Sequence, residues 1–291
     1  MMLKRFLNNP ILKPKKDNDW ESKLVFNPAA VYENGIFHLL YRAVGDDNIS
    51  RIGYAISADG YEFFRFDKPV FTPRGVAESK GCEDPRIVRL EDKFYMTYTA
   101  YSIKGIRVAL ASTKNFIQWE RYGVILPDME NKDAVLFPEK INGRYVMLHR
   151  PMEPPRSIWI AYSDDLIRWG DFKKIMEPVK DRWDGIGIGS ASPPVRTEKG
   201  WLLIYHGINH DSVYRLGVAL LDLEDPSKVI GRYPEPILEP EEEYELRGEV
   251  REVVFGCGIC EVEDKYFIYY GAADKVICGA TVEKREILSL F

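Results

Sequence analysis

Residues that could carry acid–base or anion-binding chemistry occur at equivalent positions of a strand that the chain repeats five times. At one position of this central strand, three of the five copies carry a potential cation, namely Arg42, Arg150 and His206. The other two copies carry Thr99 and Gly271. The residue that opens the preceding strand is a carboxylate in only one copy; these residues are Asn27, Asp84, Phe137 and then small side chains. We therefore expect one acid, Asp84, to face a cluster of cations.

One acid among several cations restricts the reactions that this cluster could catalyse. Ordinary glycosidases use two carboxyl groups, one to protonate the leaving oxygen and one as a nucleophile or as a base for water. A single carboxylate instead favours a reaction in which an anion takes the place of the activated water. Inorganic phosphate is already a nucleophile at neutral pH, so it requires positive charge and orientation more than it requires a base.

Strands arranged in repeated units must position these residues. A second strand follows each central strand, and its five copies align at successive steps of 50 to 61 residues on Ala55, Ala111, Ala161, Ala219 and Ala280. A period of this size that is built from strands predicts an all-β fold, a five-bladed β-propeller. Equivalent strands of the blades would then line one central channel.

The N-terminus is expected to complete the last blade. In four units an Ile/Leu-Pro segment follows the second strand, at residues 69–73, 124–127, 174–178 and 236–240. The fifth such segment, PILKP, lies at 10–14, ahead of the first unit. We therefore expect Pro10 to Leu12 to pair with the last blade, which would close the ring and remove an exposed sheet edge. Because no low-complexity linker interrupts the chain, residues 1–291 are expected to form a single domain.

Composition excludes several classes of partner. The formal net charge of -5 provides no basic surface for a nucleic acid. No stretch reaches the roughly 18 apolar residues that a membrane span needs, and the N-terminus lacks a signal-peptide pattern, so a cytoplasmic location is expected. Cys257 and Cys260 have no second Cys or His pair to complete a zinc site, and buried free thiols are expected instead. The abundance of Lys and Glu is typical of proteins from hot environments.

Six motifs together resemble glycoside hydrolase family 130, the β-mannoside phosphorylases and related mannosidases. They follow the order of the family over nearly the whole chain: FNPAAV, LLYRAVG, CEDPRIV, NKDAVLFPEKINGRYVMLHRP, GWLLIYHG and YYGAAD. The resemblance implies a five-bladed propeller that needs no metal and no cofactor, with inorganic phosphate as the co-substrate. It also implies inverting phosphorolysis of terminal β-1,2- or β-1,4-mannosides to give α-D-mannose 1-phosphate.

The same resemblance implies roles for individual residues. Asp84 resembles the catalytic acid, which in this family is thought to act through a hydroxyl group of the mannose. The residues expected to bind phosphate are Arg107, Lys132, Tyr205 and His206. The residues expected to bind the sugar are Asn27, Arg42, Arg51, Glu83, Arg86, Arg150, Tyr214 and Asp274.

Other functions and other residue roles stay open at this point. A mannosidase of the same family would hydrolyse the substrate, and a carbohydrate-binding propeller would use Asp84 only as a hydrogen-bond partner. His149 could belong either to the core or to the site. The Ser-x-Asp segments at 57–59 and 163–165 are expected to be turns, since Asp and Ser side chains commonly bond the backbone two residues on. A homo-oligomer is possible, and linkage and acceptor specificity are left open.

Overall fold

Strands make up most of residues 2–291, which the computed structural model describes, and the few helices are short. The first unit contains β2 (Leu24–Glu33), β3 (Ile36–Val44), β4 (Ser50–Ser57) and β5 (Phe64–Arg65). The second contains β6 (Gly81–Leu90), β7 (Lys93–Ser102), β8 (Gly105–Thr113) and β9 (Glu120–Leu126). The third contains β10 (Asn131–Leu136), β11 (Tyr145–Pro151), β12 (Ile158–Ser163) and β13 (Gly170–Met176).

The remaining strands form two further units. The fourth contains β14 (Gly187–Ser190), β15 (Val195–Arg196), β16 (Trp201–Ile208), β17 (Tyr214–Leu221) and β18 (Val229–Arg232). The fifth contains β19 (Val254–Val262), β20 (Lys265–Ala272), β21 (Val276–Glu283) and, from the N-terminus, β1 (Lys4–Arg5). The helices are the 3-10 turns η1 (Asp19–Glu21) and η2 (Val76–Glu78) and the α-helices α1 (Glu243–Leu246) and α2 (Lys284–Leu288).

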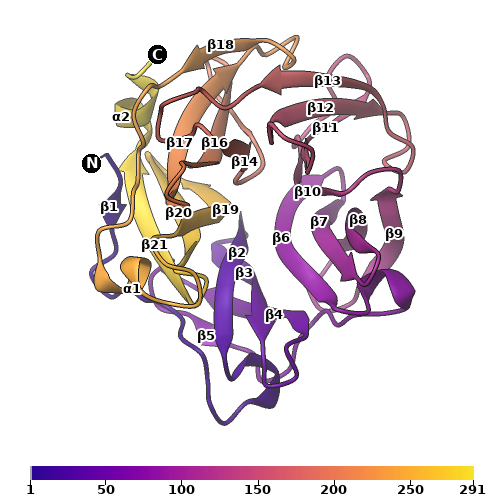
Figure 1. Ribbon diagram of the computed structural model, residues 1–291, viewed down its shortest axis with the longest axis vertical. Helices are drawn as coiled ribbons and strands as arrows, with labels where there is room; N and C mark the ends of the chain where they lie inside the picture. The colour runs from indigo at the N-terminus through magenta and orange to yellow at the C-terminus, as the bar shows by residue number, and fades with distance from the viewer. Residues whose placement is uncertain (1) are drawn as a thin grey trace.

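Each unit is an antiparallel sheet, and the units surround a common central region. The first two units form one eight-stranded sheet, because a single parallel bridge between Ser50 and Gly81 joins β4 to β6. The inner strands β2, β6, β10, β14 and β19 lie nearest the middle of the molecule (Figure 1). The fold class is therefore all-β, with its strands in several sheets, as the repeat predicts.

The N-terminal segment pairs with the last unit, as expected for Pro10 to Leu12. Leu12 forms an antiparallel bridge with Ile277 of β21. The structure adds a pairing that the PILKP segment does not indicate, because β1 lies against the same strand with Lys4 opposite Thr281. The Ser-x-Asp segments are turns, as predicted: the Asp59 carboxylate accepts from the backbone N–H groups of residues 61 and 62.

A buried Tyr–carboxylate–Arg group, here called a clamp, recurs in four of the five units within residues 2–291. In each clamp the Tyr lies on the central strand, the acid precedes the inner strand, and the Arg lies on the outer strand. The four clamps are Tyr41–Glu21–Arg65, Tyr98–Glu78–Arg121, Tyr205–Asp184–Arg232 and Tyr270–Glu245–Arg5. Three of the four clamp acids lie in short helical segments: Glu21 in η1, Glu78 in η2 and Glu245 in α1.

The third unit has a neutral group in place of a clamp in the described chain. His149 occupies the position of the clamp tyrosine, and its Nδ1 lies 2.8 Å from Asn131 Nδ2. The ring of Phe172 packs edge-on against His149 at 5.5 Å, on the side where other units carry the arginine. Burial lowers the pKa of His149 to about 3, so the ring is neutral. His149 is therefore a residue of the core and not of the site.

Candidate active site

Three neighbouring inner strands carry a bulge with a polar residue in the left-handed backbone region. The residues are Asn27 on β2, Asp84 on β6 and Asp133 on β10, with φ of 48°, 47° and 54°. The pairing register shifts at each of these positions. Asn and Asp enter this region more readily than other non-glycine residues, because their short polar side chains bond locally. A bulge turns the side chain out of the regular alternation, here toward the shared centre.

Asp133 corrects the expectation that Asp84 is the one carboxylate in this ring. The sequence comparison placed Phe137 at the equivalent position because Phe137 precedes a proline, as Asn27 and Asp84 do. In the structure Phe137 lies four residues further along, where its backbone N–H bonds Val146 and its ring is in the core. The site therefore holds two fully buried inner-strand carboxylates.

Asp84 is surrounded by donors. Asn27 Nδ2 lies 2.8 Å from Asp84 Oδ1, Arg42 Nη1 lies 3.1 Å from the same oxygen, and Lys132 Nζ lies 3.2 Å from Oδ2. Burial by itself would raise the pKa of Asp84, but the charges of Lys132, Arg42 and Arg86 lower it well below its ordinary value. Asp84 is therefore an ionised carboxylate at neutral pH, even though it is almost completely buried, with only 1% of its surface exposed.

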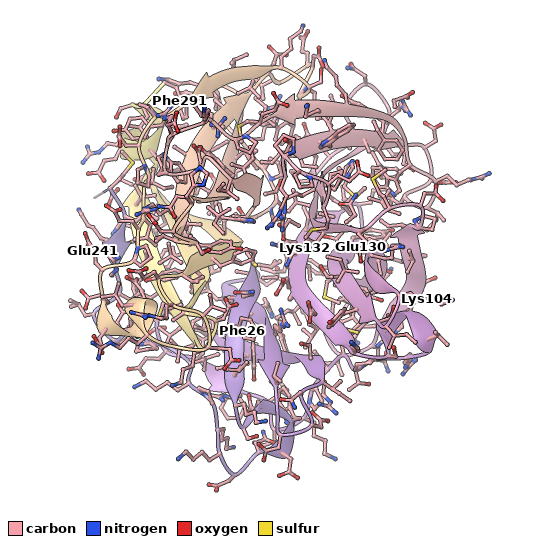
Figure 2. All side chains as sticks on the ribbon, in the orientation of Figure 1. Phe26, Lys104, Glu130, Lys132, Glu241 and Phe291 are labelled. Atoms are coloured by element: carbon pink, nitrogen blue, oxygen red, sulfur yellow. The ribbon has the colours of Figure 1, made fainter. Side chains whose placement is uncertain are left out.

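Arg42 links Asp84 to its sequence neighbour Glu83. Its Nη2 lies 2.6 Å from Glu83 Oε1, and its guanidinium stacks over the ring of Phe26 at 4.6 Å. Phe26 and Lys132 both lie near the middle of the molecule, where the inner strands converge (Figure 2). Arg42 is thus held on three sides, so it presents a fixed positive charge beside the acid.

Asp133 holds a second group of side chains, two arginines and a histidine. Arg86 Nη2 lies 3.0 Å from Asp133 Oδ1, and Arg150 Nε lies 2.6 Å from Oδ2. His206 Nε2 lies 3.3 Å from the same Oδ2. Burial would raise the pKa of Asp133, but Arg150, Arg86 and Lys132 lower it well below its ordinary value.

His206 and Tyr214 lie on one aromatic surface. The His206 ring packs on Phe255 at 4.3 Å, and the Tyr214 ring contacts both of these rings at 6.1 Å. Burial lowers the pKa of His206 to about 4, even though Asp133 opposes this shift, so the imidazole is neutral at pH 7. Its Nδ1 is buried and has no hydrogen-bond partner within residues 2–291.

Asp274 lines a cavity of about 520 Å³ together with Arg42, Glu83 and Phe26. Burial, followed by repulsion from Asp84, raises the pKa of Asp274 to about 6, although Arg42 and Lys132 oppose the shift. The volume suits a small saccharide, and the lining combines charged side chains with the ring of Phe26. Asp274 and Arg42 were both predicted to bind sugar, and the structure places them in the same cavity.

Three predicted residues are not brought to this cluster. Arg51 forms an ion pair with Asp47 on the loop that leads into β4. Arg107 donates to the backbone carbonyls of Pro127 and Ile106. Tyr205 lies behind the site as a clamp residue, because neighbouring side chains on a strand point to opposite faces and His206 occupies the inner face.

A metal site is not formed by the described residues: within 2–291 there is no group of three or more His, Cys, Asp or Glu side chains that could hold an ion. The four cysteines are free and buried. No helix in this range is long and apolar enough to cross a membrane.

Comparison with known proteins assigns the family. The family model described as beta-1,4-mannooligosaccharide phosphorylase, glycoside hydrolase family 130, matches residues 2–291. The chain is 50% identical to the 1,2-beta-oligomannan phosphorylase and 48% identical to the beta-1,2-mannobiose phosphorylase of Thermoanaerobacter sp. strain X514, and each match covers 98% of both chains. The chain belongs to glycoside hydrolase family 130.

A solved structure agrees with this assignment. The beta-1,2-mannobiose phosphorylase from Listeria innocua, in complex with beta-1,2-mannobiose, superposes with a TM-score of 0.93 at 32% sequence identity. The superposition covers 100% of this chain and 99% of that one. The similarity therefore extends over all the units described above.

Proposed function

We propose that this protein is an inverting β-mannoside phosphorylase that cleaves terminal β-mannosides with inorganic phosphate and releases α-D-mannose 1-phosphate. The observation that carries the proposal is the environment of the two buried carboxylates. Asp133 already accepts from Arg86, Arg150 and His206, so it has no free oxygen to activate water. We assign the acid to Asp84, which resembles the catalytic acid of the family and lies beside cations that suit an anionic nucleophile.

Phosphate would bind on the side of the cluster formed by Lys132, Arg150 and His206. Lys132 is the most exposed of these, with 20% of its side chain accessible, whereas Arg150 and His206 lie behind it. Arg107 and Tyr205 are omitted from this set, because their polar groups are bonded elsewhere. Arg86 is fully buried and would support the set from below.

The mannose ring would occupy the cavity lined by Arg42 and Asp274, with Asn27 and Glu83 at its base. Arg42 and Glu83 are bonded to each other, so together they offer both donors and acceptors to sugar hydroxyl groups. Tyr214 would provide an aromatic surface at the other edge. Arg51 on β4 stays a predicted sugar ligand only at the periphery, where it pairs with Asp47 of the cavity lining.

Asp84 would become an acid when phosphate enters. An approaching dianion competes for Lys132, and loss of that partner raises the pKa of the Asp84 carboxyl. The carboxyl takes up a proton from water as its pKa rises, and then transfers it, through a mannose hydroxyl, to the oxygen of the departing sugar. Phosphate attacks the anomeric carbon from the opposite face in a single displacement, which inverts the configuration.

A preference for β-1,2 linkages is the more specific part of the proposal. It is supported by the relatives with 50% and 48% identity, which are a 1,2-beta-oligomannan and a beta-1,2-mannobiose phosphorylase, and by the superposed beta-1,2-mannobiose phosphorylase of Listeria innocua. We also propose that residues 1–291 form a single domain, a five-bladed propeller that the N-terminal segment closes. The pairing of β1 and Leu12 with β21 supports it.

Incubation with β-1,2-mannobiose, in the presence and absence of phosphate, tests the reaction. We expect cleavage only with phosphate, and α-mannose 1-phosphate as the product. Equal cleavage in both reactions would show a mannosidase. Binding without any cleavage would show a carbohydrate-binding protein.

A further inference from the structure

We infer that Asp133 is a positioning residue of the phosphate site, which fixes Arg150 and His206 in the geometry that receives phosphate. The inference rests on the proposed function and adds a residue that neither the sequence motifs nor the family resemblance assigned. Asp133 itself does not touch the substrate in this role. It acts through the side chains that it holds.

The partners of Asp133 come from three different units. Arg86 lies on β6, Arg150 on β11 and His206 on β16, and each donates to one of the two carboxylate oxygens. The clamp acids, by contrast, join strands within one unit. Asp133 instead joins neighbouring units at the point where their inner strands converge.

Asp133 also determines which nitrogen of His206 is free. A carboxylate oxygen can only accept, so the neutral His206 ring carries its proton on Nε2, the nitrogen that faces Asp133. Nδ1 is therefore unprotonated, and it is a buried nitrogen without a partner in the described chain. Such an atom is ready to accept a hydrogen bond from a ligand, and a hydrogen phosphate has one P–O–H group to donate.

A substitution at Gly189 can perturb the contact between Asp133 and His206. A Cβ atom at Gly189 would lie 2.6 Å from Asp133 Oδ2 and 2.7 Å from His206 Nε2. The substitution Gly189→Ala would therefore push these two side chains apart without replacing either residue. Gly256, on the inner strand β19, is a matched control, because a Cβ atom there would meet its neighbours at 3.4 Å.

The first test compares Asp133→Asn with Asp184→Asn, the same change in a buried clamp acid. We expect Asp133→Asn to raise the KM for phosphate by about tenfold or more, while the KM for β-1,2-mannobiose stays within about twofold. Asp184→Asn should lower the melting temperature without this selective change. Calorimetric titration with inorganic phosphate measures the same loss of affinity without turnover.

The second test uses the glycine variants, which keep every charged residue. We expect Gly189→Ala, but not Gly256→Ala, to raise the KM for phosphate selectively. The inference is overturned if Asp133→Asn and Gly189→Ala leave the phosphate KM unchanged, or raise both KM values equally. A wild-type protein that cleaves mannobiose without phosphate would instead overturn the proposed function.

Discussion

Arg5 and Glu245 lie 240 residues apart in the chain, yet the Arg5 guanidinium donates to both carboxylate oxygens of Glu245 at 2.8 Å. Glu245 is fully buried and also accepts from the hydroxyl of Tyr270 at 2.7 Å. The contact gives the last unit the same clamp that three other units form from their own outer strands. The N-terminal segment therefore supplies a side chain, as well as a strand, to the end of the chain.

Replacement of Arg5 by Met should destabilise the protein strongly. The change leaves the buried Glu245 carboxylate without its cation, which costs about 3 kcal/mol, or roughly 5 °C or more in melting temperature. Arg247→Met is the control, because Arg247 and Glu243 form an exposed pair worth about 0.5 kcal/mol or less. Thermal unfolding measures both. Equal, small shifts would contradict the importance of the clamp.

Tyr205→Phe should affect stability and leave phosphate binding unchanged. The variant removes one donor to Asp184, whose other partner is Arg232, and should cost about 1 to 2 kcal/mol. The KM for phosphate should stay within about twofold of the wild-type value. His206→Gln, one residue further along the strand, should raise this KM. A selective rise in the Tyr205→Phe variant would return Tyr205 to the phosphate site.

Asp84→Asn should abolish most of the turnover while the protein still folds and binds mannobiose. Asn is isosteric and can keep a hydrogen bond to Asn27 or Arg42, but it cannot supply a proton. Loss of a general acid typically lowers kcat by about 10² to 10⁴. Steady-state kinetics and calorimetric binding of mannobiose separate the two effects. A variant with near-normal kcat would remove Asp84 from the mechanism.

Asp274 should introduce a pH dependence near 6. Because its pKa is raised to about 6, Asp274 takes up a proton as the pH falls through this value and becomes a neutral, weaker acceptor for a sugar hydroxyl. The KM for mannobiose should therefore rise below about pH 6, and Asp274→Asn should flatten that profile. An unchanged acid limb in the variant would assign the limb to another group.

Thermal stability provides a second measurement on Asp274. A carboxyl whose folded pKa lies above its unfolded value binds its proton more tightly in the folded state. Its contribution to stability therefore falls as the pH rises from about 4 to about 6, and the ionised group is unfavourable at pH 7. Asp274→Asn should raise the melting temperature at pH 7 relative to wild type, and much less at pH 4.

The repeated strand allowed part of the site to be predicted from sequence. Arg150 pairs with Lys132, and Arg42 pairs with Phe26, at equivalent positions of their central strands. His206 has the same register with Gly189. Side chains at these positions point to the centre because the strand period is two and the repeat preserves it. Arg42, Arg150 and His206 therefore lie at equivalent register positions, with the two arginines charged and His206 neutral.

Asp133 shows where the prediction from sequence failed, and Tyr205 shows where the contacts favour a role other than the predicted one. Asp133 was missed because the alignment followed proline, whereas the feature shared with Asp84 is a bulge with a left-handed backbone. The family resemblance implies that Tyr205 binds phosphate, although three other copies of the repeat also have a tyrosine at this position, namely Tyr41, Tyr98 and Tyr270. That recurrence was a signal for a structural role. The Arg partner of each clamp was not visible, because it lies on a different strand of its unit.

The pairing of β1 with β21 has a consequence for synthesis. Arg5 leaves the ribosome well before its partner Glu245, which follows it by 240 residues. Because β1 pairs with β21, the last sheet gains this edge strand only after β21 has been translated. We therefore expect closure of the last unit to wait for β21, however early the other units form.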